Sequence, residues 1–433
     1  WLWRGKADQK KWISKGAPFA LEACIQEMRP PLRLLFLLTS LSFATNGLFT
    51  PLFALAISPA NHTLGINYGM VADNFPPPLT ALQLVKSVGI SQVKIYSANA
   101  STLQAFANSG ISFIVGIGNE DLHALTNPQN ALAWVQTHIV PYIATTSISA
   151  IAVGNEVLTT TDTQLIQDLL PAILSLHAAL NASLPPSTPS ISISTPHSLA
   201  ILSSSYPPSS ARFNPSISDS SLHPLALFLS QTGSPFMINA YPYFAYKDNP
   251  NTISLPYTLF QSNDGVQDIN NGLHYYNMLD AQVDAIYSAL GALGFGDVKV
   301  IVTETGWPSQ GDADELGANK KNAQAYTVNI MKRLASQKGT PLKPSIPLEA
   351  YLFALFNEDS KPGPTSERNY GLFNPNGTHV YDLGISVANS QVSAKNNYHS
   401  VPKFSSSSHP LPLTSTLVFT TTIFGLMILL KAC

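Results

Sequence analysis

Short apolar runs alternate with longer segments of helical spacing between Leu64 and about Asn357. The runs are apolar at nearly every position rather than at every second one, which is typical of strands covered on both faces of a parallel sheet. Eight of them are expected to be strands: 64–69, 92–97, 111–118, 148–156, 190–195, 235–244, 298–306 and 348–358. Helices are expected between them, for instance at 79–88, 101–109, 129–139, 163–180, 278–291 and 318–337.

Eight strands that alternate with helices predict an α/β protein with a single large domain, a (β/α)8 TIM barrel. A doubly wound open sheet is the alternative that periodicity leaves open. Two segments are longer than ordinary loops, the Ser/Pro-rich region 184–221 and the insert 247–272, and both flank the sixth expected strand. Long loops on a rigid scaffold are where binding surfaces are commonly built.

The N-terminal region shows the pattern of a targeting segment. From Met28, two arginines precede an apolar stretch that ends in Ala54-Leu55-Ala56, which predicts a signal peptide over 28–56. A retained membrane anchor is the alternative. Residues 1–27 are expected to be a non-native extension, so that the folded domain spans 57–390.

The C-terminal region also carries a processing pattern. A Ser-rich linker over 391–408 precedes an apolar segment over 409–433. Small polar residues followed by an apolar tail predict a glycosylphosphatidylinositol attachment signal, in which the tail is a propeptide that a lipid replaces. A transmembrane helix is the alternative, because the apolar run is nearly long enough to span a bilayer. We therefore expect a monomer in the secretory pathway, lipid-anchored at the outer face of the plasma membrane or in the cell wall.

Composition narrows the class of protein. The 433 residues are 45% hydrophobic and only 11% charged, with a net charge of -2, which does not suit disorder or nucleic-acid binding. The only cysteines are Cys24 and Cys433, both in segments expected to be removed, and the histidines are scattered. No cofactor and no metal site are expected. Four sequons predict glycosylation, at Asn61, Asn99, Asn181 and Asn376.

Two glutamates stand at the ends of apolar runs, Glu156 in "VGNEV" and Glu304 in "TETGWPS". The C-terminal ends of barrel strands converge on one face, so the ends of the fourth and seventh strands can face each other there. Glycoside hydrolysis uses such a pair of carboxyl groups. The structural alternative is that each acid merely lies near a helix N-terminus, where the macrodipole favours it.

Together with "INYG" at the first strand and "FNEDSKPGPTSERNYGLF" from Phe356, these motifs resemble glycoside hydrolase family 17, the plant β-1,3-glucanases, over about 64–383. The resemblance implies a (β/α)8 barrel that hydrolyses internal β-1,3-glucosidic bonds with retention of configuration. It implies that Glu156 is the general acid/base and Glu304 the nucleophile. It also implies that Asn155 hydrogen-bonds the 2-hydroxyl of the sugar being cleaved.

The resemblance further implies a polar cluster near the two acids, made of Glu358, Lys361 and Glu367. The nucleophile must stay ionised, so we expect Glu304 to be held by hydrogen bonds and by a cation such as Lys361. Desolvation and a neighbouring negative charge would keep Glu156 protonated. Retention requires the two carboxyl groups to lie about 5 to 5.5 Å apart.

Aromatic side chains are the second requirement, because pyranose rings stack their C–H faces on flat side chains. Candidates at or just after strand ends are Tyr68, Tyr96, Tyr241, Tyr243, Phe244 and Trp307. Core packing is the default for any one of them, and stacking is favoured for Tyr241 and Trp307. The Tyr241 hydroxyl is also expected to reach the nucleophile. The sequence thus predicts an endo-β-1,3-glucanase of wall glucans such as callose; a mixed-linkage β-1,3/1,4-glucanase and a catalytically silent β-glucan-binding wall protein remain open.

Overall fold

Parallel strands form a closed barrel in this computed structural model, which describes residues 63–384. They pair into one nine-stranded sheet in the order β5-β4-β3-β2-β1-β13-β12-β9-β6. The strands are β1 Leu64–Tyr68, β2 Gln92–Ile95, β3 Ser112–Ile117, β4 Ser147–Val153, β5 Ser192–Ser194, β6 Pro196–Ser198, β9 Phe236–Asn239, β12 Val300–Thr305 and β13 Ala350–Leu352.

The two end members of this sheet, β5 and β6, are separated in the chain by Thr195 alone. One bent strand therefore pairs with β4 on one side and with β9 on the other. This pairing closes the ring with eight strand positions. The (β/α)8 barrel is confirmed, and the open doubly wound sheet is wrong.

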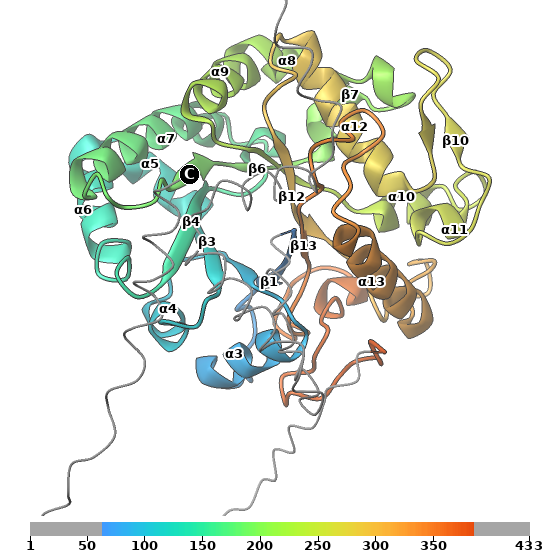
Figure 1. The fold of residues 1–433 in the computed structure, drawn as a ribbon, viewed down its shortest axis with the longest axis horizontal. Coiled ribbons are helices and arrows are strands. Elements are labelled where there is room, and N and C mark those ends of the chain that lie inside the picture. Colours follow the sequence, from blue (N-terminus) through green and yellow to red (C-terminus); the bar gives the residue numbers. More distant parts are fainter. Residues whose placement is uncertain (1–62, 385–433) are drawn as a thin grey trace, which may run out of the picture. The chain divides into compact units, whose positions relative to one another are not determined.

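Helices surround the strands (Figure 1), and all six expected ones are present. The helices are α3 Pro78–Ser87, α4 Ala100–Ala105, α5 Leu122–Leu125, α6 Pro128–His138, α7 Thr163–Ser183, α8 Pro215–Ile217, α9 His223–Thr232, α10 Pro242–Asp248, α11 Leu255–Thr258, α12 Met278–Ala292 and α13 Lys320–Ala335. Short 3-10 or π turns lie at Asn119–Asp121, Val157–Thr159, Leu199–Ile201, Pro208–Ser210, Ser218–Leu222 and Thr365–Arg368. Several helices begin where an Asn or Asp side chain accepts a backbone N–H, as Asp162 does for α7 and Asn277 for α12.

The strands are apolar throughout because both of their faces are covered. Inside the barrel, a buried cluster consists of Ile114, Ala150, Ala152, Met237, Ile301 and Tyr351. The Tyr351 ring takes the space beside Gly65, where a Cβ atom would lie only 2.2 Å from Tyr351 Cδ1. The interior is thus a packed core and not a channel.

The two long segments expected from the sequence pack against α12. The first contains the antiparallel pair β7 Leu202–Ser204 and β8 Arg212–Phe213. The second contains β10 Val266–Gln267, whose antiparallel partner β11 His274–Tyr275 follows just beyond it. Asp268 joins them, because its carboxylate accepts hydrogen bonds from Ser209 N at 2.8 Å and from Ser209 Oγ at 2.7 Å. Two inserts that are far apart in the sequence therefore support each other.

All described residues belong to the first of two units of the chain, Trp1–Ile385, whereas the second is Ser386–Cys433. The expected N-terminal extension, signal peptide, Ser-rich linker and apolar propeptide all lie outside the described residues. The sequon at Asn61 lies outside them as well.

Candidate active site

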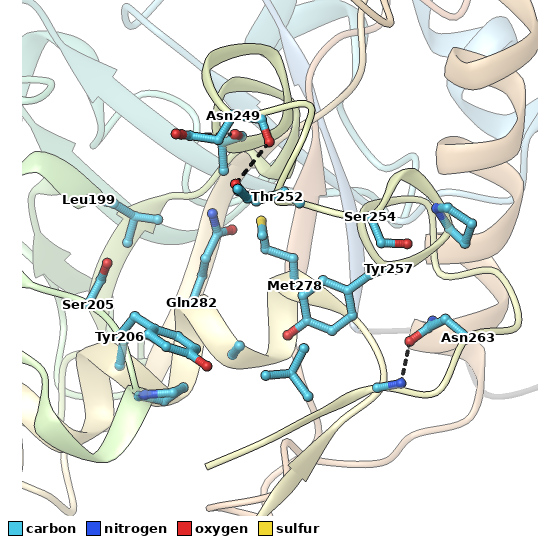
Figure 2. Close-up of a pocket in the computed structure, with 18 of the residues that line it drawn as sticks. Leu199, Ser205, Tyr206, Asn249, Thr252, Ser254, Tyr257, Asn263, Met278 and Gln282 are labelled. Carbon is cyan, nitrogen blue, oxygen red and sulfur yellow. Dashed lines mark hydrogen bonds between the residues drawn. The ribbon is translucent and has the colours of Figure 1, made fainter. Parts of the chain in front are cut away.

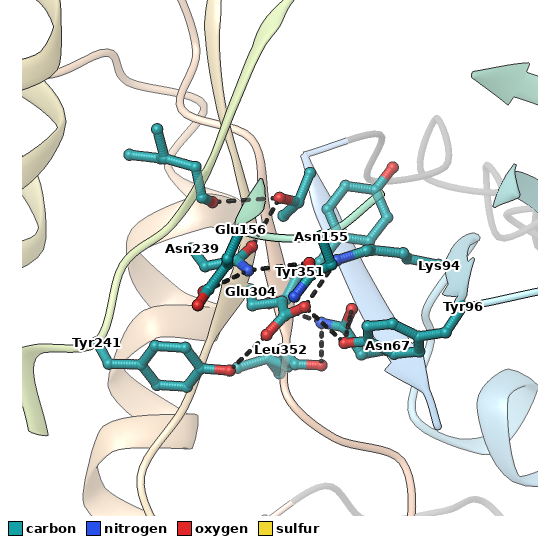
Figure 3. A network of polar contacts seen from close by, with 12 residues as sticks. Asn67, Lys94, Tyr96, Asn155, Glu156, Asn239, Tyr241, Glu304, Tyr351 and Leu352 are labelled. Atoms are coloured by element: carbon teal, nitrogen blue, oxygen red, sulfur yellow. Dashed lines mark hydrogen bonds and ion pairs between the residues drawn. The ribbon is translucent and has the colours of Figure 1, made fainter. Parts of the chain in front are cut away.

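Glu304 lies within β12, at the mouth of the barrel, and its carboxylate accepts three hydrogen bonds (Figure 3). Lys94 Nζ and the Tyr96 hydroxyl each donate to Oε1 at 2.7 Å. The Tyr241 hydroxyl donates to Oε2 at 2.9 Å. The sequence-based prediction that this hydroxyl reaches Glu304 is thus confirmed by the geometry. Three donors on one carboxylate hold it in a single orientation.

Two strands that do not pair with each other, β2 and β9, supply these donors. Lys94 and Tyr96 are two residues apart at the end of β2, so both side chains point to the same face of the strand. Tyr241 follows β9, which pairs with β12. Lys94 is only 1% exposed, and a lysine buried to that extent requires a counter-charge, which Glu304 supplies.

The pKa of Glu304 reflects two opposing effects. Burial raises the pKa, but the Lys94 charge and the hydrogen bonds from Lys94, Tyr96 and Tyr241 outweigh it and leave the pKa below its ordinary value. Glu304 therefore stays ionised under mildly acidic conditions. Such a carboxylate can act as a nucleophile.

The expected cation was the wrong one. Lys361 lies 3.5 Å from Glu358 Oε2, and its ammonium group is 4.0 Å from the centre of the Phe353 ring. It is Lys94 that contacts the nucleophile candidate. The sequence contained a signal for this, because Lys94 is the single charged residue in the otherwise apolar run "VKIY".

Glu156 lies beyond the end of its strand, since β4 stops at Val153 and not at residue 156 as expected. Its backbone has a φ of 55°, in the left-handed region that is uncommon for residues other than glycine. The Glu156 N–H donates to Pro196 O at 2.9 Å, which helps to hold this conformation. A costly backbone conformation of this kind often marks a functional position.

The pKa of Glu156 is shifted in the opposite direction to that of Glu304. Burial raises the pKa most, and the negative charge of Glu304 raises it further, while the Asn239 hydrogen bond and the Lys94 charge oppose the rise. The carboxyl group can therefore carry a proton at a pH where Glu304 is ionised. This is the division of roles expected from the sequence.

Asn239 connects the two acids, and it was not among the expected site residues. It is the last residue of β9 and the register partner of Glu304 on β12. Its Nδ2 donates to Glu156 Oε1 at 2.9 Å and lies 3.3 Å from Asn155 Oδ1. Because Asn239 is adjacent to one acid and bonded to the other, Glu156 and Glu304 lie at the same end of the barrel.

Asn155 lies beside these acids, where the resemblance places it. Its backbone N–H donates to Asn119 Oδ1 at 2.7 Å, and Asn119 Nδ2 donates back to Asn155 O at 3.1 Å. A cavity of about 300 Å³ is lined by Asn155, Lys94, Tyr96 and the turn after β3. This hollow opens beside the side chains that surround Glu304.

Three of the candidates for sugar stacking are core residues instead: Trp307, Tyr68 and Tyr243. Trp307 is 1% exposed, its Nε1 donates to Gly317 O at 2.8 Å, and its ring packs against Tyr243 and Tyr326. Tyr68 is 3% exposed and packs against phenylalanine rings. The prediction that either ring offers a stacking surface is wrong, because neither face is open to a ligand. Tyr243 is likewise completely buried.

Phe244 is the aromatic residue that remains available. It is 37% exposed, and its ring centre lies 5.4 Å from that of the half-buried Tyr241. Tyr370, which the sequence did not single out, supports Tyr241 and Phe353 from behind by edge contacts. The ring of Phe244 can therefore contact a ligand close to Glu304.

The acidic cluster after β13 lies close to the same site. Glu358 is 2% exposed and accepts the Val71 N–H at 2.9 Å. Burial raises the pKa of Glu367; Lys361 opposes the rise, and the charges of Glu315 and Glu304 add to it. Lys361 lies over the Phe353 ring, which contacts Tyr96 and Tyr241, the two tyrosines that bond Glu304. The expected cluster therefore lies near the acids.

Three of the four sequons fall on described residues. Asn181 and Asn376 are exposed, and Asn99 is partly exposed and caps α4 through its Oδ1. Glycosylation at these positions stays a prediction.

Comparison with known proteins agrees with this geometry. The family model for glycosyl hydrolases family 17 matches residues 64–385. Glucan endo-1,3-beta-glucosidase 11 of Arabidopsis thaliana is 49% identical over 344 residues, which are 78% of this chain and 80% of that protein. Glucan endo-1,3-beta-glucosidase 14 of the same plant is 48% identical, over 80% of this chain and 88% of its own length.

Solved structures agree as well. CJP38, a beta-1,3-glucanase and allergen of Cryptomeria japonica pollen, matches with a TM-score of 0.70 and 40% identity over 74% of this chain and 98% of its own. One of two plant beta-glucan endohydrolases with distinct substrate specificities matches with a TM-score of 0.68 and 35% identity, over 74% of this chain and all of its own. The family match, these relatives and the paired glutamates lead to one conclusion: the chain belongs to glycosyl hydrolases family 17.

Proposed function

We propose that this protein is an endo-β-1,3-glucanase that hydrolyses internal bonds of β-1,3-glucans such as callose. The observation that carries the proposal is the pair of carboxyl groups at one end of the barrel: Asn239 is the register partner of Glu304 and donates to Glu156 Oε1 at 2.9 Å. Their surroundings lower the pKa of Glu304 and raise that of Glu156. A glycosidase needs one ionised and one protonated carboxyl group at the same pH. The relatives named as glucan endo-1,3-beta-glucosidases supply the substrate class.

The reaction proceeds in two displacements with retention of configuration. Glu304 attacks the anomeric carbon while Glu156 gives its proton to the glycosidic oxygen, so that the leaving chain departs as an alcohol. Glu156, now ionised, takes a proton from a water molecule, which attacks the glycosyl–Glu304 ester. The bond to Glu304 breaks and the sugar leaves with its original β configuration.

The surrounding side chains support each step. Lys94, Tyr96 and Tyr241 orient the Glu304 carboxylate before the attack. The side-chain amides of Asn155 and Asn239 lie beside Glu156 and form a hydrogen bond with each other. A sugar hydroxyl can take the place of either amide as the hydrogen-bond partner of the other. Phe244 offers a ring face to a neighbouring glucose unit.

Substitution of Glu304 by Gln tests the assignment. We expect the release of reducing sugar from a pure β-1,3-glucan to fall by several orders of magnitude in Glu304→Gln, because an amide cannot form the glycosyl ester. Glu349→Gln is the matched control, since Glu349 pairs with Lys299 away from the acids. Unchanged release in Glu304→Gln would show that the nucleophile is another residue.

Two further measurements separate the alternatives. Proton NMR of the first product should show the β anomer, and the α anomer would contradict retention. Rates on a pure β-1,3-glucan and on a mixed-linkage β-1,3/1,4-glucan decide between the two specificities. Binding without cleavage of either glucan would identify a silent glucan-binding protein.

The location is proposed from the sequence patterns alone. The signal pattern over 28–56 and the Ser-rich and apolar pattern over 391–433 support a lipid-anchored protein at the outer face of the plasma membrane. A phosphatidylinositol-specific phospholipase should release it from plant membranes. Retention on the membrane after this treatment would favour a spanning helix instead.

A further inference from the structure

A second hollow, of about 1140 Å³, lies where the two inserts meet α12 (Figure 2). Its walls come from the segment around β7, from the region of α10 and α11, and from the start of the β10–β11 hairpin. Met278 and Gln282 of α12 contribute to its lining. The Asp268 bonds to Ser209 connect the inserts next to it, so the hollow is already formed in the absence of a ligand.

This pocket, which we call the insert pocket, is separate from the acids. The residues that hydrogen-bond Glu156 and Glu304 do not line it. Helix α10 marks the boundary, because Ala245 and Asn249 line the insert pocket and are four residues apart, on one helix face. Tyr241 and Phe244 precede them and belong to the surroundings of Glu304.

The chemistry of the insert pocket is neutral and amphipathic. Its lining contains many hydroxyl and amide side chains but no lysine or arginine, and Asp264 is its one carboxylate. Figure 2 shows the rings of Tyr206 and Tyr257 directed into the same hollow from different walls. Tyr206 is 69% exposed, whereas Tyr257 is 8% exposed and is held in place. An anionic ligand has no counter-charge here, but an uncharged sugar finds ring faces and hydroxyl partners.

Gln282 adds a second observation. Its Oε1 is buried and has no hydrogen-bond partner among the described residues. An unpaired buried acceptor costs free energy, and a ligand that carries hydroxyl donors can remove this cost when the amide turns toward it.

We propose that the insert pocket is a second, non-catalytic binding site for a β-1,3-glucan chain. This proposal rests on the proposed function, because the polymer that is cleaved also supplies the ligand. A long glucan can occupy the active site with one stretch and the insert pocket with another. Once the active site has bound one stretch, a second stretch of the same chain is present at a high effective concentration near the insert pocket. Binding there slows the release of the enzyme from the polymer.

Tyr206→Ala tests the proposal, because the side chain is exposed and its removal should not disturb the fold. Tyr276→Ala is the matched control: Tyr276 directly follows β11, is 61% exposed and does not line the insert pocket. Both changes are made in the full protein carrying Glu304→Gln, and electrophoresis through gels containing laminarin, a soluble β-1,3-glucan, measures their affinity. We expect Tyr206→Ala to weaken binding about five-fold, and Tyr276→Ala to leave it unchanged.

Kinetics without the Glu304 substitution provide the second readout. In Tyr206→Ala, kcat/KM on the long polymer should fall. On a β-1,3-linked glucose trimer, kcat/KM should stay the same, because we expect a trimer to occupy one site at a time. Equal loss on the trimer would show that the pocket is part of the active-site cleft and would overturn the proposal, as would full retention of laminarin binding. Absence of cleavage by the unsubstituted protein would instead contradict the proposed function.

Discussion

Lys94 and Glu304 are 210 positions apart in the chain, yet Lys94 Nζ lies 2.7 Å from Glu304 Oε1. Both side chains are almost completely buried. Two charges that have lost their water depend on each other, and removal of one leaves the other uncompensated. This pair determines the protonation state of the nucleophile.

Replacement of Lys94 by Met should move the acidic limb of the pH–rate profile to higher pH. The Lys94 charge lowers the pKa of Glu304, so its loss raises that pKa. Glu304 is then protonated, and inactive, at a pH where the unsubstituted enzyme works. The measurement is kcat/KM between about pH 3 and pH 8.

Lys299→Met is the matched control for this change, because the Lys299–Glu349 pair at 2.6 Å involves a half-exposed lysine. An exposed pair contributes only about 0 to 1 kcal/mol, so activity and pH profile should be preserved. An unmoved acidic limb in Lys94→Met would contradict the role given to Lys94.

Replacement of Tyr241 by Phe should lower kcat/KM about ten-fold or more. The change removes the hydroxyl that donates to Glu304 Oε2 at 2.9 Å, and a hydrogen bond to a charged group contributes about 1.5 to 3 kcal/mol. The ring and its contacts with Phe244 and Phe353 remain. Thermal unfolding should therefore be unchanged within a few degrees.

Tyr243→Phe is the control for Tyr241→Phe. The Tyr243 hydroxyl is buried without a partner among the described residues, so its removal should leave activity intact and should not reduce stability. Equal activity losses in the two variants would show that the Tyr241 hydroxyl has no special role.

Replacement of Asn239 by Ala should move the alkaline limb of the pH–rate profile to higher pH. The unsubstituted enzyme loses activity on this side as Glu156 gives up its proton, at a pKa above the ordinary value of 4.5. The Asn239 hydrogen bond favours the ionised form and lowers this pKa, so its loss raises the pKa. A limb that moves to lower pH would show that Glu156 does not control it.

Replacement of Gly65 by Ala tests the packing of the barrel interior. The added methyl group would meet the Tyr351 ring at 2.2 Å, so the core must shift at a cost of about 1 to 3 kcal/mol. Gly291→Ala is the control, because nothing lies within 4 Å of its Cβ position and alanine suits helix α12 better. Thermal unfolding should fall by several degrees in the first variant and should not fall in the second.

The repeat of strands and helices was readable because burial on both faces of a parallel sheet leaves near-continuous apolar runs. Glu156 and Glu304 stood out because each breaks such a run at its end. The bend at Thr195 could not be predicted from the sequence. It exists because one strand must pair with β4 on one side and with β9 on the other to close the barrel. The left-handed backbone of Glu156 was not readable either, because it depends on the path of the chain between the end of β4 and the turn at Val157–Thr159.

The sequence by itself determined the barrel, the two acids and the family, because periodicity and motifs are properties of neighbouring residues. Only the tertiary structure decided which distant side chains meet: Lys94 rather than Lys361 contacts Glu304, and Asn239 bridges to Glu156. Trp307 shows the limit most clearly, since it follows Glu304 by three residues and yet turns into the core against Tyr243. These side chains meet because the strands that carry them are brought together when the barrel closes. Closure requires all the strands to pair, so it cannot be read from any one segment of the sequence.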